Sequence, residues 1–226
     1  MGPDGLETKL EQLYARRFTT DQRREKTRLW KTLVDCFFYR YVPADGTVLD
    51  LGAGYCEFIN NVRAARRIAV DLNPETARTA AAGVEVHRLA LQRLTDAIEP
   101  ASVDFAFASN VFEHLRSPDC LLAVLAAVHR VLRVGGKLMI VQPNIRCVRA
   151  AFWDFVDHTL PLTEKGMAEA LELSGFEVIE CRSRFLPYTT KSGLPQWPGL
   201  VRLYLAFPPA QWAMGGQMLL LGRRAG

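Results

Sequence analysis

The chain has 226 residues, of which 49% are hydrophobic and 23% are charged, and its formal net charge is +4. These values exclude a disordered, a collagen-like and a coiled-coil protein, and the length favours one folded domain over residues 1–226. Residues 1–40 hold nine Lys and Arg against six Asp and Glu, so +3 of the net charge lies there. We interpret this excess as a solvated helix face, because a nucleic-acid-binding protein usually shows a broader basic stripe.

The five cysteines lie far apart in the sequence and form no Cys-x-x-Cys pair. This spacing argues against a zinc site and against a disulfide framework, so we expect reduced thiols and no bound metal. No apolar run reaches about 18 residues, the length that a membrane span needs, and residues 1–17 lack the apolar region of a signal peptide. We therefore expect a cytoplasmic protein without a membrane span.

The first half of the chain predicts a helical arm followed by alternating strands and helices. Apolar residues recur at helical spacing over 7–17 and 22–41, so residues 1–42 are expected to form an arm or lid. A β-branched run over 47–51 predicts a strand that opens onto a glycine loop, with a helix starting near Glu57. Beyond it we expect strands over 67–71, 84–89, 103–108 and 137–142, and helices over 74–82 and 117–132.

The second half is less regular. Residues 144–162 show no clear period, and 186–200 contain three prolines, which indicates a loop lying over the sheet. Between and after them we expect a helix over 163–174 and strands over 176–181 and 216–222. Strands alternating with helices indicate an α/β fold with a mostly parallel sheet.

The strongest local signal is the loop Asp50-Leu-Gly-Ala-Gly54 at the end of the first predicted strand. Glycines at 52 and 54 allow a sharp turn and close approach of a ligand to the backbone. A dinucleotide fingerprint needs a third glycine at position 57, where this chain has Glu57, and a Walker loop needs Gly-Lys-Ser/Thr, which is absent. Both of those readings are therefore weakened.

The run Asp50-x-Gly52-x-Gly54 resembles motif I of the class I S-adenosylmethionine-dependent methyltransferases, and it departs from that motif at Cys56, where the family has a third glycine. The segment Val111-Phe-Glu-His-Leu115 resembles motif IV of the small-molecule branch of the family. The resemblance covers residues 47 to about 181. It implies a Rossmann-like three-layer sandwich with a seven-stranded, mostly parallel sheet whose last strand is antiparallel. It also implies S-adenosylmethionine as the cofactor.

The resemblance assigns cofactor contacts residue by residue. Asp71 lies 21 residues after Asp50 and matches motif II, so it is expected to accept hydrogen bonds from ribose hydroxyls; the alternative is an N-cap before Pro74. The acid that the family often places after the third strand is missing here, so adenine has no expected side-chain acceptor. The predicted binding residues are Tyr14 and Arg16 on the arm, with Asp50, Gly52, Ala53, Gly54, Asp71, Leu72, Ala90, Leu91 and Asn110.

Two histidines are candidates for a general base, which a hydroxyl acceptor requires. His158 is the first, because it follows the fifth strand, where the acceptor pocket of this fold usually forms; the alternative is a structural histidine. His114 is the second, and its alternative is that Glu113 and His114 only orient the loop beneath the cofactor. We expect residues 144–162 and 186–215 to be insertions at the acceptor site, although aromatic residues as dense as those of 186–215 are more often core.

The predicted function is methyl transfer by in-line displacement to the oxygen or nitrogen of a small molecule such as a sugar, a secondary metabolite or a quinone-like compound. Such a biosynthetic enzyme needs no metal, because the sulfonium already activates the methyl group. We expect no nucleic-acid partner, and a homodimer is one option. Two alternatives stay open: a cofactor-binding protein of the same fold without turnover, and an RNA or protein methyltransferase that uses the basic arm.

Overall fold

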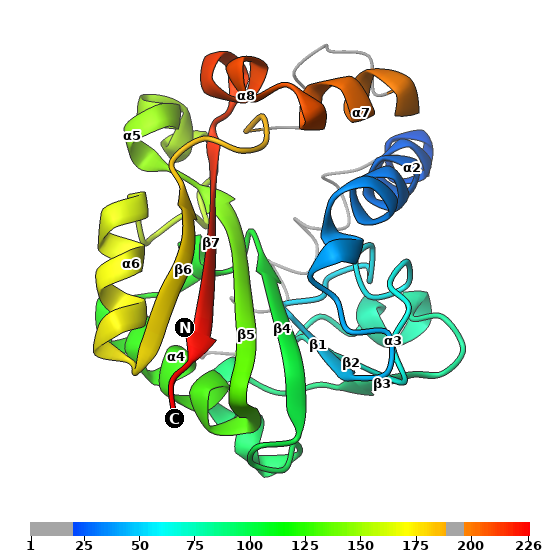
Figure 1. Cartoon of the computed structure of the whole chain (residues 1–226), viewed down its shortest axis with the longest axis vertical. Helices are drawn as coiled ribbons and strands as arrows, with labels where there is room; N and C mark the ends of the chain where they lie inside the picture. The colour runs from blue at the N-terminus through cyan, green and yellow to red at the C-terminus, as the bar shows by residue number, and fades with distance from the viewer. Residues whose placement is uncertain (1–19, 189–196) are drawn as a thin grey trace.

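The structure is a computed structural model that describes residues 20–188 and 197–226. Its centre is a seven-stranded sheet with the strand order β3-β2-β1-β4-β5-β7-β6 (Figure 1). The strands are β1 (Thr47–Leu51), β2 (Arg66–Val70), β3 (Val84–His87), β4 (Val103–Ser109), β5 (Leu132–Pro143), β6 (Phe176–Arg182) and β7 (Gln217–Arg224).

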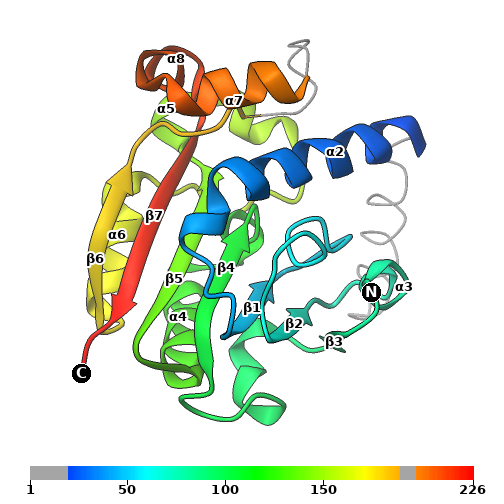
Figure 2. The ribbon, with the colours of Figure 1, turned by 45° about the vertical axis from the view of Figure 1, so that its right-hand side comes forward.

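The sheet is parallel from β3 to β5, and β7 runs antiparallel to both of its neighbours, β5 and β6. Helices cover both of its faces, as Figure 2 shows, which completes three layers. The predicted fold, a Rossmann-like sandwich with a mostly parallel sheet and an antiparallel last strand, is therefore confirmed.

The core consists of two apolar layers, one on each face of the sheet. Alternate residues of β4 divide between them, since Ala106 and Ala108 face one layer and Phe105 and Phe107 face the other. The first layer includes the apolar faces of α4 (Pro118–Val131) and α6 (Glu164–Leu173). The second includes α2 (Thr20–Cys36) and the short helix η1 (Phe38–Arg40).

Short helices occupy most of the connections between the strands. They are α3 (Glu75–Thr79), η2 (Leu91–Asp96), η3 (Phe112–His114), α5 (Ile145–Val148) and η4 (Arg149–Asp154). No helix in the described ranges is long and apolar enough to cross a membrane.

The glycine loop continues into turns, so the helix predicted near Glu57 is wrong. Residues 52–61 form turns, and Gly52, Gly54 and Cys56 all have positive φ angles. The three left-handed residues prevent a right-handed helix from starting before Glu57, and the residues after it form only turns. The backbone amides after the loop therefore do not form the anion site that a helix start would provide.

The segment before β7 also differs from the prediction. Residues 198–214 form α7 (Pro198–Ala206) and α8 (Pro208–Met214), so the predicted loop over 186–200 ends in a helix. Prolines 198 and 208 stand at the first positions of these helices, where a missing N–H costs nothing. Residues 189–196 of that predicted loop lie outside the described residues.

Candidate functional site

A cavity of about 1050 Å³ is lined by residues that follow β1 and β4 and by residues of α2, α7 and α8. Figures 1 and 2 show these three helices beyond the carboxyl ends of the parallel strands. The volume lies at the upper end of the range of small-molecule sites. Apart from Tyr14 and Arg16, which lie outside the described residues, all the predicted binding and catalytic residues line this cavity: Asp50, Gly52, Ala53, Gly54, Asp71, Leu72, Ala90, Leu91, Asn110, His114 and His158.

The two glycines of the loop are required for different reasons. A Cβ atom at Gly52, whose φ angle is +65°, would stand 2.5 Å from a methyl group of Val111, so only glycine fits. A Cβ atom at Gly54 would meet nothing within 4 Å, because this glycine faces open space in the cavity wall. Gly54 has a φ angle of +53°, which glycine adopts without strain.

Cys56 keeps the backbone conformation of the glycine that it replaces. Its φ angle is +61°, which costs a non-glycine residue about 1 kcal/mol. The side chain is fully buried, its Sγ atom lies 3.5 Å from the Thr76 carbonyl oxygen, and burial raises the pKa of the thiol to about 12. The Cys56 thiol is therefore a packing group beside the loop and stays protonated.

Asp71, directly after β2, holds the glycine loop. One carboxylate oxygen accepts a hydrogen bond from the Gly54 amide at 2.7 Å, and the other accepts from the Asn73 amide at 2.8 Å. Each carboxylate oxygen has two lone pairs, so both keep an acceptor position for further donors. Asn73, not Asp71, accepts from the first turn of α3, through the Glu75 amide at 3.0 Å.

Asp50 lies beneath the loop and is 4% exposed. Burial, with the nearby carboxylates of Glu57 and Asp71, raises the pKa of Asp50 well above its usual range, although a hydrogen bond from the Ile59 backbone opposes the shift. Burial likewise raises the pKa of Asp71. These three acidic side chains line the same end of the cavity. In their ionised form, these carboxylates favour a ligand with a positive centre.

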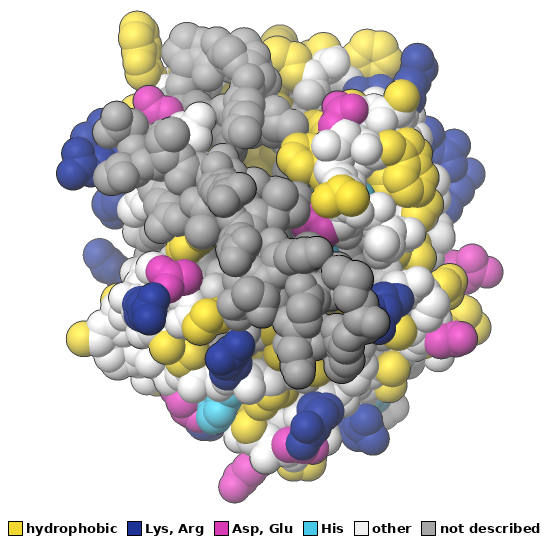
Figure 3. Space-filling model, turned by 180° about the vertical axis from the view of Figure 1, so that it is seen from behind, with side chains coloured by type: hydrophobic (Ala, Val, Ile, Leu, Met, Phe, Trp, Pro, Cys, Tyr) yellow, Lys and Arg dark blue, Asp and Glu magenta, His cyan; other side chains and the backbone are white. Residues whose placement is uncertain are grey.

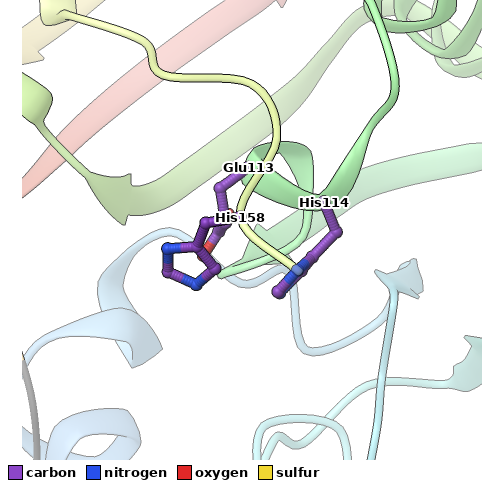
Figure 4. Close-up of side chains that lie close together, drawn as sticks. All are labelled: Glu113, His114 and His158. Carbon is purple, nitrogen blue, oxygen red and sulfur yellow. The ribbon is translucent and has the colours of Figure 1, made fainter. Parts of the chain in front are cut away.

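In the wall of the same cavity, Glu113 and His114 of η3 meet His158, which follows η4 (Figure 4). The amides of Thr159 and Leu160 donate to the Glu113 carbonyl oxygen at 2.8 and 3.0 Å, which ties the two segments together. His158 is 8% exposed, and its Nδ1 atom lies 3.5 Å from the Tyr188 hydroxyl. The structure therefore brings together the two predicted catalytic histidines.

Glu113 is the most buried member of this cluster, with 1% exposure. Its Oε2 atom has no hydrogen-bond partner among the residues that the structure describes. Burial raises the pKa of Glu113 to about 7, and the adjacent His114 opposes this shift. An unsatisfied buried carboxyl oxygen is costly in a folded protein, so this position calls for a ligand.

Comparison with protein families finds one match, and it covers the glycine loop, Asp71 and η3. The family model described as "Methyltransferase domain" matches residues 49–140. The chain carries a class I S-adenosylmethionine-dependent methyltransferase domain. The predicted family, enzyme class and cofactor are thereby confirmed, whereas the acceptor is not determined by this match.

Solved structures share the fold of this methyltransferase at low sequence identity. A putative methyltransferase from Haloferax volcanii, in complex with the Trm112 activator, has a TM-score of 0.65 and 16% identity, covering 90% of this chain and 93% of that one. A S-adenosylmethionine-dependent methyltransferase from Archaeoglobus fulgidus has a TM-score of 0.60 and 17% identity, covering 85% and 94%.

A third similar structure is geranyl diphosphate C-methyltransferase from Streptomyces coelicolor A3(2), in complex with Mg²⁺, geranyl diphosphate and S-adenosyl-L-homocysteine. Its TM-score is 0.61 and its identity is 14%, covering 90% of this chain and 81% of that chain. A search of curated proteins finds no match.

In the methyltransferase the residues present fit the cofactor. The cavity offers acidic side chains, acceptor positions on the Asp71 carboxylate and a glycine loop open enough for close approach. The predicted gap in adenine recognition persists, since Ala90 and Leu91 line the cavity as apolar contacts. Gln92, whose amide oxygen can accept a hydrogen bond, also lines it.

Several wall residues of the methyltransferase escape prediction from sequence. Lys26 and Trp30 of α2 line the cavity, and Lys26 pairs with Glu57 at 2.9 Å. Their sequence signal is only that of an amphipathic helix, and it does not say which cavity the helix covers. Glu113 had a usable signal, since it stands beside His114 in the Val111–Leu115 segment, but its burial was not readable from the sequence.

Proposed function

We propose that this methyltransferase transfers the methyl group of S-adenosylmethionine to an oxygen or nitrogen of a small-molecule acceptor. One observation carries the proposal: a single cavity runs from Asp50 and Asp71 to His114 and His158. A cofactor at the first end and an acceptor at the second would therefore meet without an intervening wall. Holding two reactants in this way contributes about 7–11 kcal/mol to lowering the barrier.

The acceptor end is lined mainly by apolar and aromatic side chains. Phe155 and Tyr188 stand beside His158, and α7 and α8 contribute Leu203, Tyr204, Phe207 and Met214. Such a wall suits a compact, partly apolar acceptor better than a charged polymer. On the described part of the face shown in Figure 3, Lys and Arg side chains are scattered among acidic and apolar ones.

The Streptomyces neighbour supports a small acceptor, because the molecule it holds beside S-adenosyl-L-homocysteine is geranyl diphosphate. The segments 144–162 and 186–215 supply the acceptor wall in this proposal, and 1–42 supplies a cover.

A cytoplasmic location and a homodimer remain predictions. Sedimentation velocity tests whether the protein is a homodimer.

For a hydroxyl acceptor, we assign His158 as the proton acceptor. S-adenosylmethionine supplies an activated methyl group. His158 would take the hydroxyl proton as the acceptor oxygen gains the methyl group, and the sulfur would leave as a neutral thioether when the carbon–sulfur bond breaks. His114 is positioned by Asp157, whose carbonyl and carboxylate oxygens lie 3.0 and 3.3 Å from its Nδ1 atom.

The test combines cofactor binding with product detection. The wild-type protein is expected to bind S-adenosylmethionine in calorimetry and to produce a methylated product, detected by mass spectrometry across candidate acceptors. His158→Ala should lower turnover at least tenfold with cofactor affinity unchanged, and His87→Ala, which removes a histidine paired with Glu85 on β3, serves as the control.

Unchanged turnover in His158→Ala would remove this residue from the mechanism. Cofactor binding without any product would favour a binding protein without turnover. Absence of cofactor binding at millimolar concentration would contradict the proposal as a whole.

A further inference from the structure

The cluster of Glu113, His114 and His158 has the composition of a metal site. One carboxylate oxygen and one ring nitrogen from each histidine lie within 4.8 Å of one another, and the side chains converge from η3 and the segment after η4 (Figure 4). Ligands bound about 2.1 Å from one ion stand about 3–3.5 Å apart. Small rotations of these side chains therefore complete the set.

Two features show that the cluster is built and not accidental. Asp157 contacts Nδ1 of His114 through its backbone carbonyl oxygen at 3.0 Å and its carboxylate at 3.3 Å, and this carboxylate is itself only 7% exposed. Such an outer contact fixes the orientation of a ligating imidazole and directs its other nitrogen. The buried Glu113 Oε2 atom, in turn, has no partner in the described part of the chain.

We infer that Glu113, His114 and His158 bind a divalent transition-metal ion at the acceptor end of the cavity. Two imidazoles and one carboxylate suit Zn²⁺, Fe²⁺ or Co²⁺, and they do not suit Mg²⁺ or Ca²⁺, which prefer oxygen ligands. This inference revises the expectation of no metal, which rested on cysteine spacing and on the activated methyl group of the sulfonium. Three protein ligands leave at least one coordination position, as in catalytic zinc sites.

The ion would serve the acceptor, and this part of the inference rests on the proposed function. All three ligands line the cavity, so the remaining position faces the space assigned to the acceptor. A hydroxyl group bound there would become more acidic and would lose its proton to water. The resulting oxygen anion would attack the methyl carbon as the bond between carbon and sulfur breaks. The ion keeps its oxidation state. In the metal-loaded enzyme His158 is a ligand, so water replaces it as the proton acceptor assigned above. The acceptor class is thus narrowed to molecules with an ionisable hydroxyl.

The first experiment measures metal binding and does not depend on activity. The full chain is first treated with a chelator, which is then removed. Binding of Co²⁺ is followed by visible absorption, and binding of Zn²⁺ is followed by calorimetry. We expect one ion per chain, and affinity at least tenfold weaker in Glu113→Gln and in His158→Ala. His87→Ala is the matched control, because His87 also lies beside a glutamate, Glu85, at 2.6 Å but outside the cavity.

A second measurement uses the unaltered chain and so does not depend on the folding of a variant. Bound Zn²⁺ should protect His114 and His158, and not His87, from modification by diethyl pyrocarbonate, as read by mass spectrometry. Equal modification with and without Zn²⁺, or equal Co²⁺ affinity in the wild type, Glu113→Gln and His158→Ala, would overturn the inference.

The outcomes separate this inference from the proposed function. If S-adenosylmethionine binds and product forms undiminished in chelator, methyl transfer stands and the metal role falls. If Zn²⁺ protects the two histidines but no cofactor binds, the metal site stands and the proposed function falls.

Discussion

At the residue scale, Asp71 has one observed task and one proposed task. Its carboxylate fixes the glycine loop through the Gly54 amide, and its remaining acceptor positions are the basis of the proposed ribose contact. Sequence spacing predicted the second task, since an acid about 20 residues after the loop is a known ribose partner. The first task depends on the positive φ angle of Gly54, which the spacing of residues does not express.

We predict that Asp71→Ala weakens S-adenosylmethionine binding at least tenfold, because the substitution removes the ribose acceptor and releases the loop. Calorimetry measures the affinity. Asp35→Ala, which removes an exposed acid paired with Lys31 on α2, should leave it unchanged. An Asp71→Ala protein with wild-type affinity would refute the ribose role.

Asp50 is predicted to make stability depend on pH. Its pKa is raised in the folded chain, so between its usual value and the raised one the folded state binds more protons than the unfolded state. The free energy of unfolding therefore falls as pH rises through this range. Asp50→Asn should remove this pH-dependent loss of stability. The difference in the free energy of unfolding between the variant and the wild type, measured by urea unfolding, should therefore shift in favour of the variant from pH 4 towards pH 8. A difference that does not change with pH would contradict the raised pKa of Asp50.

At the element scale, α2 is both a wall of the cavity and a part of the core. Trp30, 9% exposed, packs against Phe38, Phe58 and Phe107, with ring centroids 5.9–6.4 Å apart. Aromatic packing holds the second half of α2 against the core. Residues from Trp30 onward therefore do not fit the interpretation of residues 1–42 as a movable lid. Any opening motion would have to occur ahead of Trp30.

Trp30→Ala is expected to destabilise the protein by about 3–5 kcal/mol, because it leaves a cavity among three buried aromatic rings. Lys31→Ala on the exposed side of the same helix should cost only about 0.3–0.5 kcal/mol, as an exposed pair with Asp35 is worth little. Denaturant unfolding of both variants measures the contrast. A similar loss in the two would show that α2 contributes through its charge and not through its packing.

The elements differ in how far the sequence revealed them. Strands β1 to β4 were predictable to within two residues at each end, because each holds apolar residues and is bounded by turn residues. Strand β5 begins at Leu132, five residues before the predicted start at 137, since pairing with β4 begins at Leu132 and resumes beyond a register shift. Tertiary pairing overrode the local signal there.

The acceptor side was harder to predict. Aromatic residues over 186–215 favoured core, yet Trp197, Phe207 and Trp212 are 73%, 53% and 77% exposed. Composition gives the amount of apolar surface and not the direction in which a short helix presents it. The convergence of His114 and His158 likewise depends on backbone hydrogen bonds from Thr159 and Leu160 to Glu113, which join segments far apart in the sequence.

At the scale of the whole molecule, the cavity joins α2, the loops after β1 and β4, and α7. A ligand bound only by the folded arrangement of these parts stabilises the entire chain. At a concentration of S-adenosylmethionine one hundred times its Kd, the free energy of unfolding should rise by about 2.7 kcal/mol. Urea unfolding with and without the cofactor measures the rise, and Asp71→Ala at the same concentration should show a much smaller one.

The position of β7 between β5 and β6 has a consequence for the folding of the chain during its synthesis. Strand β6, at the edge of the described sheet, pairs with β7 alone, and β7 also covers β5. Because ribosomes build a chain from its amino end, β5 and β6 both emerge before the strand that joins them. Unpaired strand edges invite association with other chains. The nascent protein therefore exposes unpaired edges of β5 and β6 until residues 217–224 have been synthesised. We expect its tendency to aggregate to be highest when translation of that stretch is slow.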